Sequence, residues 1–200
     1  METLRRLIPL AGLVFAASVF FAYGVVSGDS PDIDASPREV ASFYSDNSGS
    51  EQATALLLAF GAPFLAIFAV ALHRALSPPG GRSAAATLAL LGGGVAVAGF
   101  LAQAGVHLAL AEGADEGVEP VALQALSTLN EDIFLGSAGA ILGTAELPRW
   151  LGWVGLALGA LTFTFAAFQA FAAAHLWIVI MSVLLYRRQG PREPSPSRAA

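Results

Sequence analysis

The feature that most constrains this chain is the length of its apolar blocks. Several run for about 20 residues or more between short polar connections, and a helix of that length crosses a hydrocarbon core of ~30 Å. Of its 200 residues, 56% are hydrophobic and 12% are charged, whereas a soluble domain carries roughly 25% charged residues. Because lipid cannot satisfy exposed backbone groups, we predict an all-α fold: an integral membrane helical bundle.

Six apolar segments are candidates for membrane spans. They cover residues 7–26, 53–72, 85–111, 121–145, 150–168 and 170–186. The last two are short, so the block 150–186 crosses the membrane either twice or once. We predict a single membrane domain over residues 1–189. The polar, proline-rich tail 190–200 is predicted to be disordered and cytoplasmic.

The placement of arginine favours six crossings. The chain has no lysine, and six crossings put nine of its ten basic residues on one side of the membrane: Arg5, Arg6, Arg74, Arg82, Arg149, Arg187, Arg188, Arg192 and Arg198. The positive-inside rule makes that side cytoplasmic, whereas five crossings would put the C-terminal arginines outside. The arginine-only, alanine-rich composition is typical of a GC-rich bacterial genome. We therefore expect a multi-pass protein of the bacterial inner membrane with both termini in the cytoplasm.

The first outer loop, expected from Gly28 to Glu51, contains a predicted short helix. Ser36 and Pro37 match an N-cap followed by proline at the first helical position. Val40, Phe43 and Tyr44 then share one face at helical spacing. This helix lies either in the outer membrane interface or as a lid on the bundle.

A polar stripe on the fourth apolar segment is the main candidate site. Asn130, Glu131 and Asp132 interrupt that segment, and Thr128 shares a helical face with Glu131. Acids at such a depth are costly and usually functional. In the third and sixth segments, the outer halves supply further candidates: Gln103, His107 and His175.

Three interpretations of this cluster remain open. The polar groups satisfy one another and only hold the helices in register; or they form an outer-facing pocket for a proton, ion or small ligand; or His107, Glu131 and His175 bind a metal, structural or hydrolytic. No single helix shows metal-ligand spacing. We expect no cofactor and no catalytic residue.

The expected partner is the lipid bilayer. The sequence shows no phosphate-binding loop, no nucleophile elbow and no basic face for nucleic acid. Two glycine pairs, Gly139 with Gly143 and Gly155 with Gly159, allow close helix approach. They predict a tight hairpin or, alternatively, a homodimer.

Several short motifs resemble one family. They are Gly28-Asp29-Ser30-Pro31, Val40-Ala41-x-Phe43-Tyr44, Leu147-Pro148-Arg149-Trp150-Leu151-Gly152-Trp153 and Leu184-Leu185-Tyr186-Arg187-Arg188. The chain is similar in them to uncharacterised multi-pass membrane proteins of high-GC actinobacteria, a family without a known activity. The resemblance implies a helical bundle in the inner membrane and brings no functional residues.

From these features, a non-enzymatic membrane protein with an outer-facing polar pocket is the leading hypothesis. The runner-up is a structural or accessory subunit of a larger membrane complex. A membrane-embedded metal hydrolase is the third.

Overall fold

The computed structural model describes residues 7–27, 30–32, 34–77, 83–139 and 167–188, with the backbone alone at 85, 131–139, 167–168 and 170. Every element in these ranges is a helix, so the predicted all-α class is confirmed. The elements are η1 (Ile8–Leu10), α2 (Ala11–Phe21), η2 (Ala22–Val26), α3 (Pro37–Asp46), α4 (Ser48–Leu76), α5 (Ala84–Asp115), α6 (Pro120–Gly139) and α8 (Ala167–Arg188).

Four helical stretches among the described residues are long and apolar enough to cross a membrane. They are Ile8–Val26, Ser48–Leu76, Ala86–Asp115 and Phe171–Arg188. Each overlaps a predicted segment, which supports the prediction of a membrane helical bundle and is compatible with a multi-pass protein. The fourth predicted segment corresponds to α6 as far as Gly139. The predicted segment 150–168 lies almost wholly outside the described residues, so six crossings stay a prediction.

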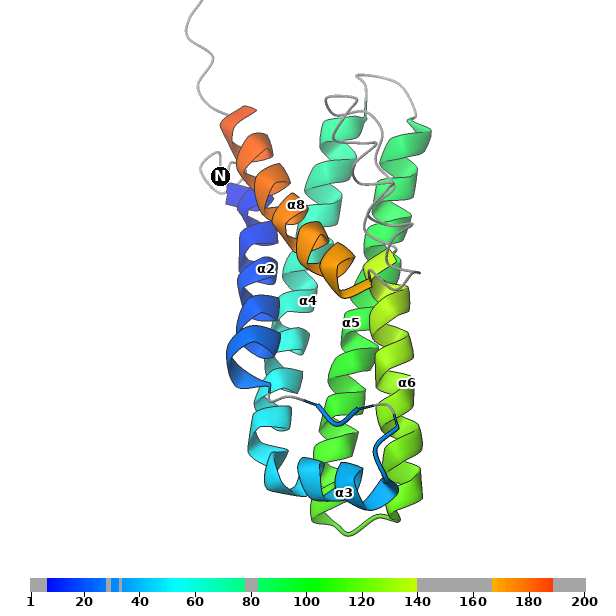
Figure 1. Cartoon of the computed structure of the whole chain (residues 1–200). Coiled ribbons are helices and arrows are strands. Elements are labelled where there is room, and N and C mark those ends of the chain that lie inside the picture. The colour runs from blue at the N-terminus through cyan, green and yellow to red at the C-terminus, as the bar shows by residue number, and fades with distance from the viewer. Residues whose placement is uncertain (1–6, 28–29, 33, 78–82, 140–166, 189–200) are drawn as a thin grey trace, which may run out of the picture.

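The long helices lie side by side and alternate in direction (Figure 1). Helix α8 begins partway along the bundle and runs beside α2 toward the end where the N-terminus lies, whereas α3 lies across the other end. We call the end that α3 covers the α3 end, and the end toward which α8 runs the opposite end. The termini of α4 and α8 bring Arg74, Arg187 and Arg188 to the opposite end, and the α5–α6 connection brings acids to the α3 end: Glu112, Asp115, Glu116 and Glu119. The two ends of the bundle therefore differ in the sign of their charges.

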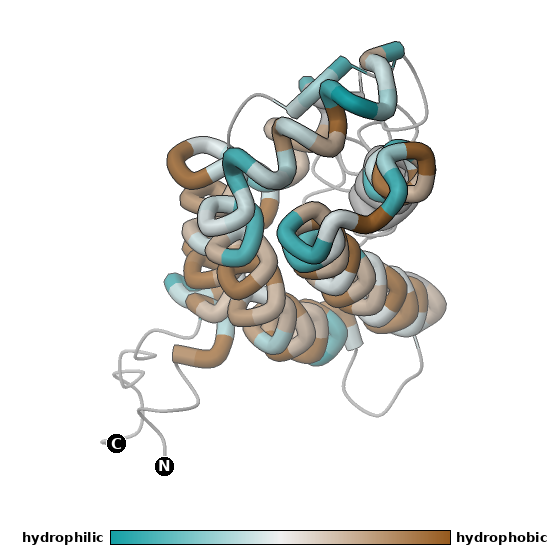
Figure 2. Tube along the Cα trace, turned by 90° about the horizontal axis from the view of Figure 1, so that it is seen from below, coloured by the Kyte–Doolittle hydropathy of each residue, from teal (hydrophilic) through white to brown (hydrophobic). Residues whose placement is uncertain are grey.

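The outward faces of the helices carry large apolar side chains. Among the most exposed side chains are Leu56 at 70%, Phe20 at 65%, Leu91 at 62% and Phe60 at 57%. Figure 2, seen from the α3 end, shows hydrophobic residues along the length of the helices and hydrophilic ones gathered on α3 and on the near helix ends. Such a belt is costly in water and expected in lipid.

Small residues let the helices approach closely toward the opposite end. A methyl group at Gly12 of α2 would meet the Ser182 hydroxyl of α8 and the Phe68 ring of α4, and one at Gly93 of α5 would meet Ala69 of α4. Close approach of this kind is how helices gain packing energy in lipid, where apolar burial alone gives little. The glycine pairs predicted for a hairpin or homodimer, Gly139/Gly143 and Gly155/Gly159, lie outside the described side chains, so both alternatives stay predictions.

The predicted loop helix is α3, and its N-terminus has the expected cap. The Ser36 backbone N–H donates to Glu39 Oε2 at 2.8 Å, and the Glu39 N–H donates to Ser36 Oγ at 3.4 Å, which makes a capping box. On its inner face Val40 and Tyr44 are buried against Leu110 of α5 and Leu123 of α6. The helix therefore rests on the bundle, as the lid alternative expects, and its position in the outer membrane interface stays a prediction.

Candidate functional site

The candidate site is built on a buried carboxylate–imidazole pair near the α3 end. Glu51 lies in the first turn of α4 and His107 two turns before the end of α5. Their side chains are 1% and 4% exposed, and His107 Nδ1 lies 2.6 Å from Glu51 Oε2. That separation is at the short limit for an N–H···O hydrogen bond. Two ionisable groups are thus held together out of contact with solvent.

Asn130 of α6 extends the pair to a third helix. Its Nδ2 lies 3.3 Å from His107 Nε2, so both ring nitrogens of His107 have a polar partner. The order Glu51–His107–Asn130 joins α4, α5 and α6 through side chains that are far apart in the sequence. We call these three residues the polar triad.

Several acceptor oxygens around the polar triad lack a hydrogen-bond partner among the described residues. They are Glu51 Oε1, Asn130 Oδ1 and Oε1 of Gln103, which lies one turn from His107 on α5. Gln103 is 1% exposed. Buried polar atoms nearly always have a partner, whether protein, water or ion. The site is therefore rich in acceptors and suited to a ligand that donates hydrogen bonds.

Helix α2 ends beside the site in a π-helical turn, η2, a form often found at functional sites. The wider turn directs the Ser27 N–H to the Ala22 carbonyl at 2.8 Å, and the Thr54 hydroxyl of α4 approaches the same carbonyl at 3.5 Å. Tyr23, on η2, has its ring centre 6.0 Å from that of His107. The π turn thus places an aromatic side chain against the polar triad.

Helix α3 packs against α6 beside the site through polar contacts as well as apolar ones. The Tyr44 and Ser127 hydroxyls are 3.1 Å apart, and Gln124 Nε2 donates to the Ala35 carbonyl at 2.8 Å. Ser127 lies one turn before Asn130 on α6. The polar stripe of α6 therefore holds α3 through Gln124 and Ser127 and, one turn further along, supplies Asn130 to the triad.

The structure brings together some of the predicted site residues and separates others. His107, Asn130 and Gln103 lie in the site. Thr128 is exposed, and its hydroxyl donates to the Gln124 carbonyl at 3.1 Å. The side chains of Glu131 and Asp132 lie outside what the structure describes, so their part in the site stays a prediction.

His175 has different neighbours from those predicted. Its Nδ1 lies 2.9 Å from the Phe171 carbonyl oxygen on its own helix, and its ring stacks on Phe15, with centres 5.6 Å apart. None of its recorded contacts is with His107, Asn130 or Glu51. Among the described residues no group of three or more acids and histidines is placed to hold a metal. Because the Glu131 side chain lies outside the described residues, the metal alternative with His107, Glu131 and His175 stays a prediction.

Glu51 is the residue that sequence reasoning missed. It was expected among the acids of the first outer loop, but α4 begins at Ser48 and includes it. A signal was present in the sequence: Glu51, Thr54, Ala55 and Leu58 repeat at helical spacing, and all four are buried. Extending the apolar face of the segment 53–72 backward by one turn would have placed this acid on the inner face.

Comparison of the chain with family models, with curated proteins and with solved structures gives no match. The site is therefore interpreted from its own chemistry.

Proposed function

We propose that this chain is a six-span protein of the bacterial inner membrane whose polar triad binds a proton. The membrane part of the proposal is supported by the four membrane-length apolar helices. The orientation, with both termini in the cytoplasm and α3 outside, is supported by the arginines at the opposite end and the acids at the α3 end. Residues 121–145 and 150–168 supply the other two spans.

The proton-binding part rests on one observation, the buried contact between Glu51 and His107. A carboxylate and an imidazole share a proton at this distance, and histidine is the side chain whose charge ordinarily changes between pH 5 and 8. Ionisable groups inside a membrane commonly mark proton or ion pathways. The pair thus has the chemistry of a reversible proton site.

Asn130 lets the site accept either protonation state. When the ring is neutral, Nδ1–H donates to the Glu51 carboxylate and Nε2 accepts from the Asn130 amide N–H. When the ring is protonated, a half-turn of the same amide presents Oδ1 to Nε2–H. The proton is taken up at Nε2, the charge of the ring balances the carboxylate, and every ring nitrogen keeps a partner.

The unpaired oxygens of Glu51 and Gln103 supply further acceptors next to this proton. They suit a water molecule that carries the proton to or from the site, since a buried water typically makes about three hydrogen bonds. Helix α3 covers this end of α5 and α6. In this proposal α3 is the lid that separates the site from the outer side of the membrane.

A titration of the His107–Glu51 pair tests the proposal. Infrared difference spectra of the protein in lipid nanodiscs between pH 8 and pH 5 should contain a difference band of the ionised Glu51 carboxylate, caused by the new charge on His107, that disappears in both Glu51→Gln and His107→Gln. The exposed Glu112, also in a helix at the α3 end, gives the matched control Glu112→Gln, which should leave that band in place. If wild type and Glu51→Gln give the same difference spectrum, the triad is a structural contact and the accessory-subunit alternative is favoured.

The acids next to Asn130 are tested in the same experiment. Glu131→Gln combined with Asp132→Asn should change the pH at which the Glu51 band appears if these acids belong to the site. An unchanged titration would show that Glu131 and Asp132 are not part of the site.

We also propose that the chain is related to the actinobacterial membrane family, a proposal that rests on the short motifs alone.

A further inference from the structure

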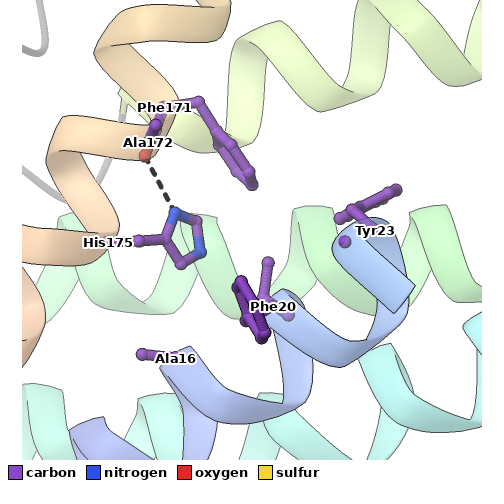
Figure 3. A pocket seen from close by; sticks show the side chains of 8 residues that line it. Ala16, Phe20, Tyr23, Phe171, Ala172 and His175 are labelled. Atoms are coloured by element: carbon purple, nitrogen blue, oxygen red, sulfur yellow. Dashed lines mark hydrogen bonds between the residues drawn. The ribbon is translucent and has the colours of Figure 1, made fainter. Parts of the chain in front are cut away.

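A second histidine, partly buried, lies beside an apolar cavity that the polar triad does not use. The cavity has a volume of about 330 Å³ and lies between α2, η2 and α8. Its walls are mainly aromatic and small side chains: Ala16, Val19, Phe20, Tyr23, Gly24, Phe171, Ala172 and His175. Figure 3 shows the His175 ring directed toward the space bounded by Phe20, Tyr23 and Phe171.

The hydrogen bonding of His175 determines what this cavity can recognise. A carbonyl oxygen only accepts, so the contact of Nδ1 with the Phe171 carbonyl requires the hydrogen to be on Nδ1. In the neutral ring Nε2 then carries a lone pair. That nitrogen is buried and has no hydrogen-bond partner among the described residues. An occupant that satisfies it must donate a hydrogen bond.

The neighbours of His175 support the neutral ring. Its ring packs against the phenyl groups of Phe15, Phe100 and Phe171, at centre separations of 5.6, 6.5 and 4.1 Å. Its hydrogen bond goes to a backbone carbonyl, and among the residues whose side chains are described no contact joins it to a carboxylate. A charged imidazolium in such apolar surroundings would be costly without an acid beside it.

The size and walls of the cavity favour a single flat ring. Its volume is at the low end of the range for small-molecule sites, roughly 300–1,000 Å³. Aromatic side chains from both α2 and α8 line it, and aromatic rings gain from edge-to-face and offset contacts beyond what area burial gives. A long acyl chain would lose these contacts and exceed the space.

The cavity opens on the lipid-facing side of the bundle. Phe20 is 65% exposed, and Gly24 and Ala172 are also exposed. Because Nε2 is itself covered, a side chain of the cavity wall has to turn aside for an occupant to reach it, and the exposed Phe20 has room for such a movement. The occupant therefore arrives from the lipid and is lipid-soluble.

We infer that this cavity binds a lipid-soluble hydroxy-aromatic ring, of the phenol or quinol type, whose hydroxyl donates to His175 Nε2. The site differs from the polar triad in both residues and ligand chemistry. It makes no use of the proton that the triad is proposed to bind.

A matched pair of probes tests the inference: 2,3,5-trimethylphenol and 2,3,5-trimethylanisole share a ring, but only the phenol has a donor. The full chain is labelled with ¹⁵N-histidine and placed in nanodiscs, and the Nε2 resonance of His175 is assigned by its loss in His175→Phe. The phenol should shift this resonance saturably and bind about five- to tenfold more tightly than the anisole, whose affinity is measured by competition.

Two tryptophan variants on α8 check that the cavity is responsible. Ala172→Trp fills it from an exposed position and should abolish the shift. Leu176→Trp, one turn along α8 at another exposed position outside the cavity, should keep it. The inference is overturned if the phenol leaves the His175 resonance unchanged, if the two probes bind equally, or if Ala172→Trp responds as wild type does.

Discussion

At the α3 end, helices α4, α5 and α6 are joined by polar side chains, whereas toward the opposite end α2, α4, α5 and α8 are joined by small ones. The first region has the Glu51–His107–Asn130 contacts. The second has Gly12 against Ser182 and Phe68, and Gly93 against Ala69. In lipid, both hydrogen bonds and close packing hold helices together. The opposite end also has a histidine contact, between His73 Nδ1 and the Ala86 carbonyl oxygen at 2.8 Å. Among the described residues only the α3 end pairs a histidine with a carboxylate, so we expect function there and rigidity at the other end.

His107 and His175 show the same contrast at the level of single residues. His107 has a carboxylate on Nδ1 and an amide on Nε2. His175 has a backbone carbonyl on Nδ1 and aromatic rings around it. Tyr23 lies between the two environments, with its ring 6.0 Å from His107 and 6.2 Å from Phe171. The partner of Nδ1 thus distinguishes a proposed proton site from a proposed site for a neutral ligand.

Breaking the polar pair should have the largest effect. Glu51→Leu leaves His107 without its acid, and His107→Leu leaves a buried carboxylate alone; each should lower the free energy of unfolding by about 3 kcal/mol or more. The double variant should lose less than the sum, because no unpaired charge remains. The measurement is a double-mutant cycle of reversible unfolding in mixed micelles. Additive losses would mean that the two side chains do not depend on each other.

Neighbouring glycines in α5 probe the close-packed region. Gly93→Ala places a methyl group against Ala69 and should lower stability by about 1–3 kcal/mol. Gly94→Ala is the matched control: its methyl group meets nothing within 4 Å, and alanine is the better helix former by roughly 0.5–1 kcal/mol. Thermal unfolding of the two variants should therefore move in opposite directions. Equal shifts would show that α4 and α5 do not pack closely at this position.

Loosening α3 without touching the triad should have a smaller effect. Ser36→Ala removes the side-chain cap of α3 and should cost about 1 kcal/mol of its local stability. Hydrogen exchange should then be faster in α3 and unchanged in the middle of α4. Ser42→Ala, at an exposed position of the same helix, is the control and should leave exchange nearly unaltered. Faster exchange throughout the bundle would indicate that α3 is part of the core.

The smallest expected effect is a pH dependence of the same cap. Hydrogen bonds from Ser36 hold the pKa of the Glu39 carboxyl below its ordinary value of 4.5. Because the folded-state pKa is the lower one, the stabilisation is present above the ordinary value and is lost as pH falls through the folded-state value. Exchange in α3 should rise in that acidic window for wild type and stay flat there in Glu39→Gln. An identical pH profile in both proteins would contradict this role of Glu39.

The sequence predicts much of the fold because the relevant signals are local. The segments that became α2, α4, α5 and α8 are apolar over enough residues to span a membrane, and the Ser36-to-Glu39 cap marks the start of α3. It predicts less of the site. His107, Gln103 and Asn130 were among the candidates, but Glu51 was assigned to a loop and His175 was expected beside His107. Those two assignments depend on how each helix is rotated about its axis and on where α4 begins.

The helical class, the membrane-length segments and the capped helix in the first loop can be read from the amino-acid sequence, as can the separation of arginines from acids. These follow from hydrophobicity and from hydrogen bonds between residues close in the chain. Three features emerge only when the helices pack: the pairing of Glu51 with a histidine 56 positions away, the approach of Tyr23 on η2 to that histidine, and the contact of His175 with an apolar cavity. Partners between helices depend on how each helix is rotated and where the helices cross, which local sequence patterns leave open.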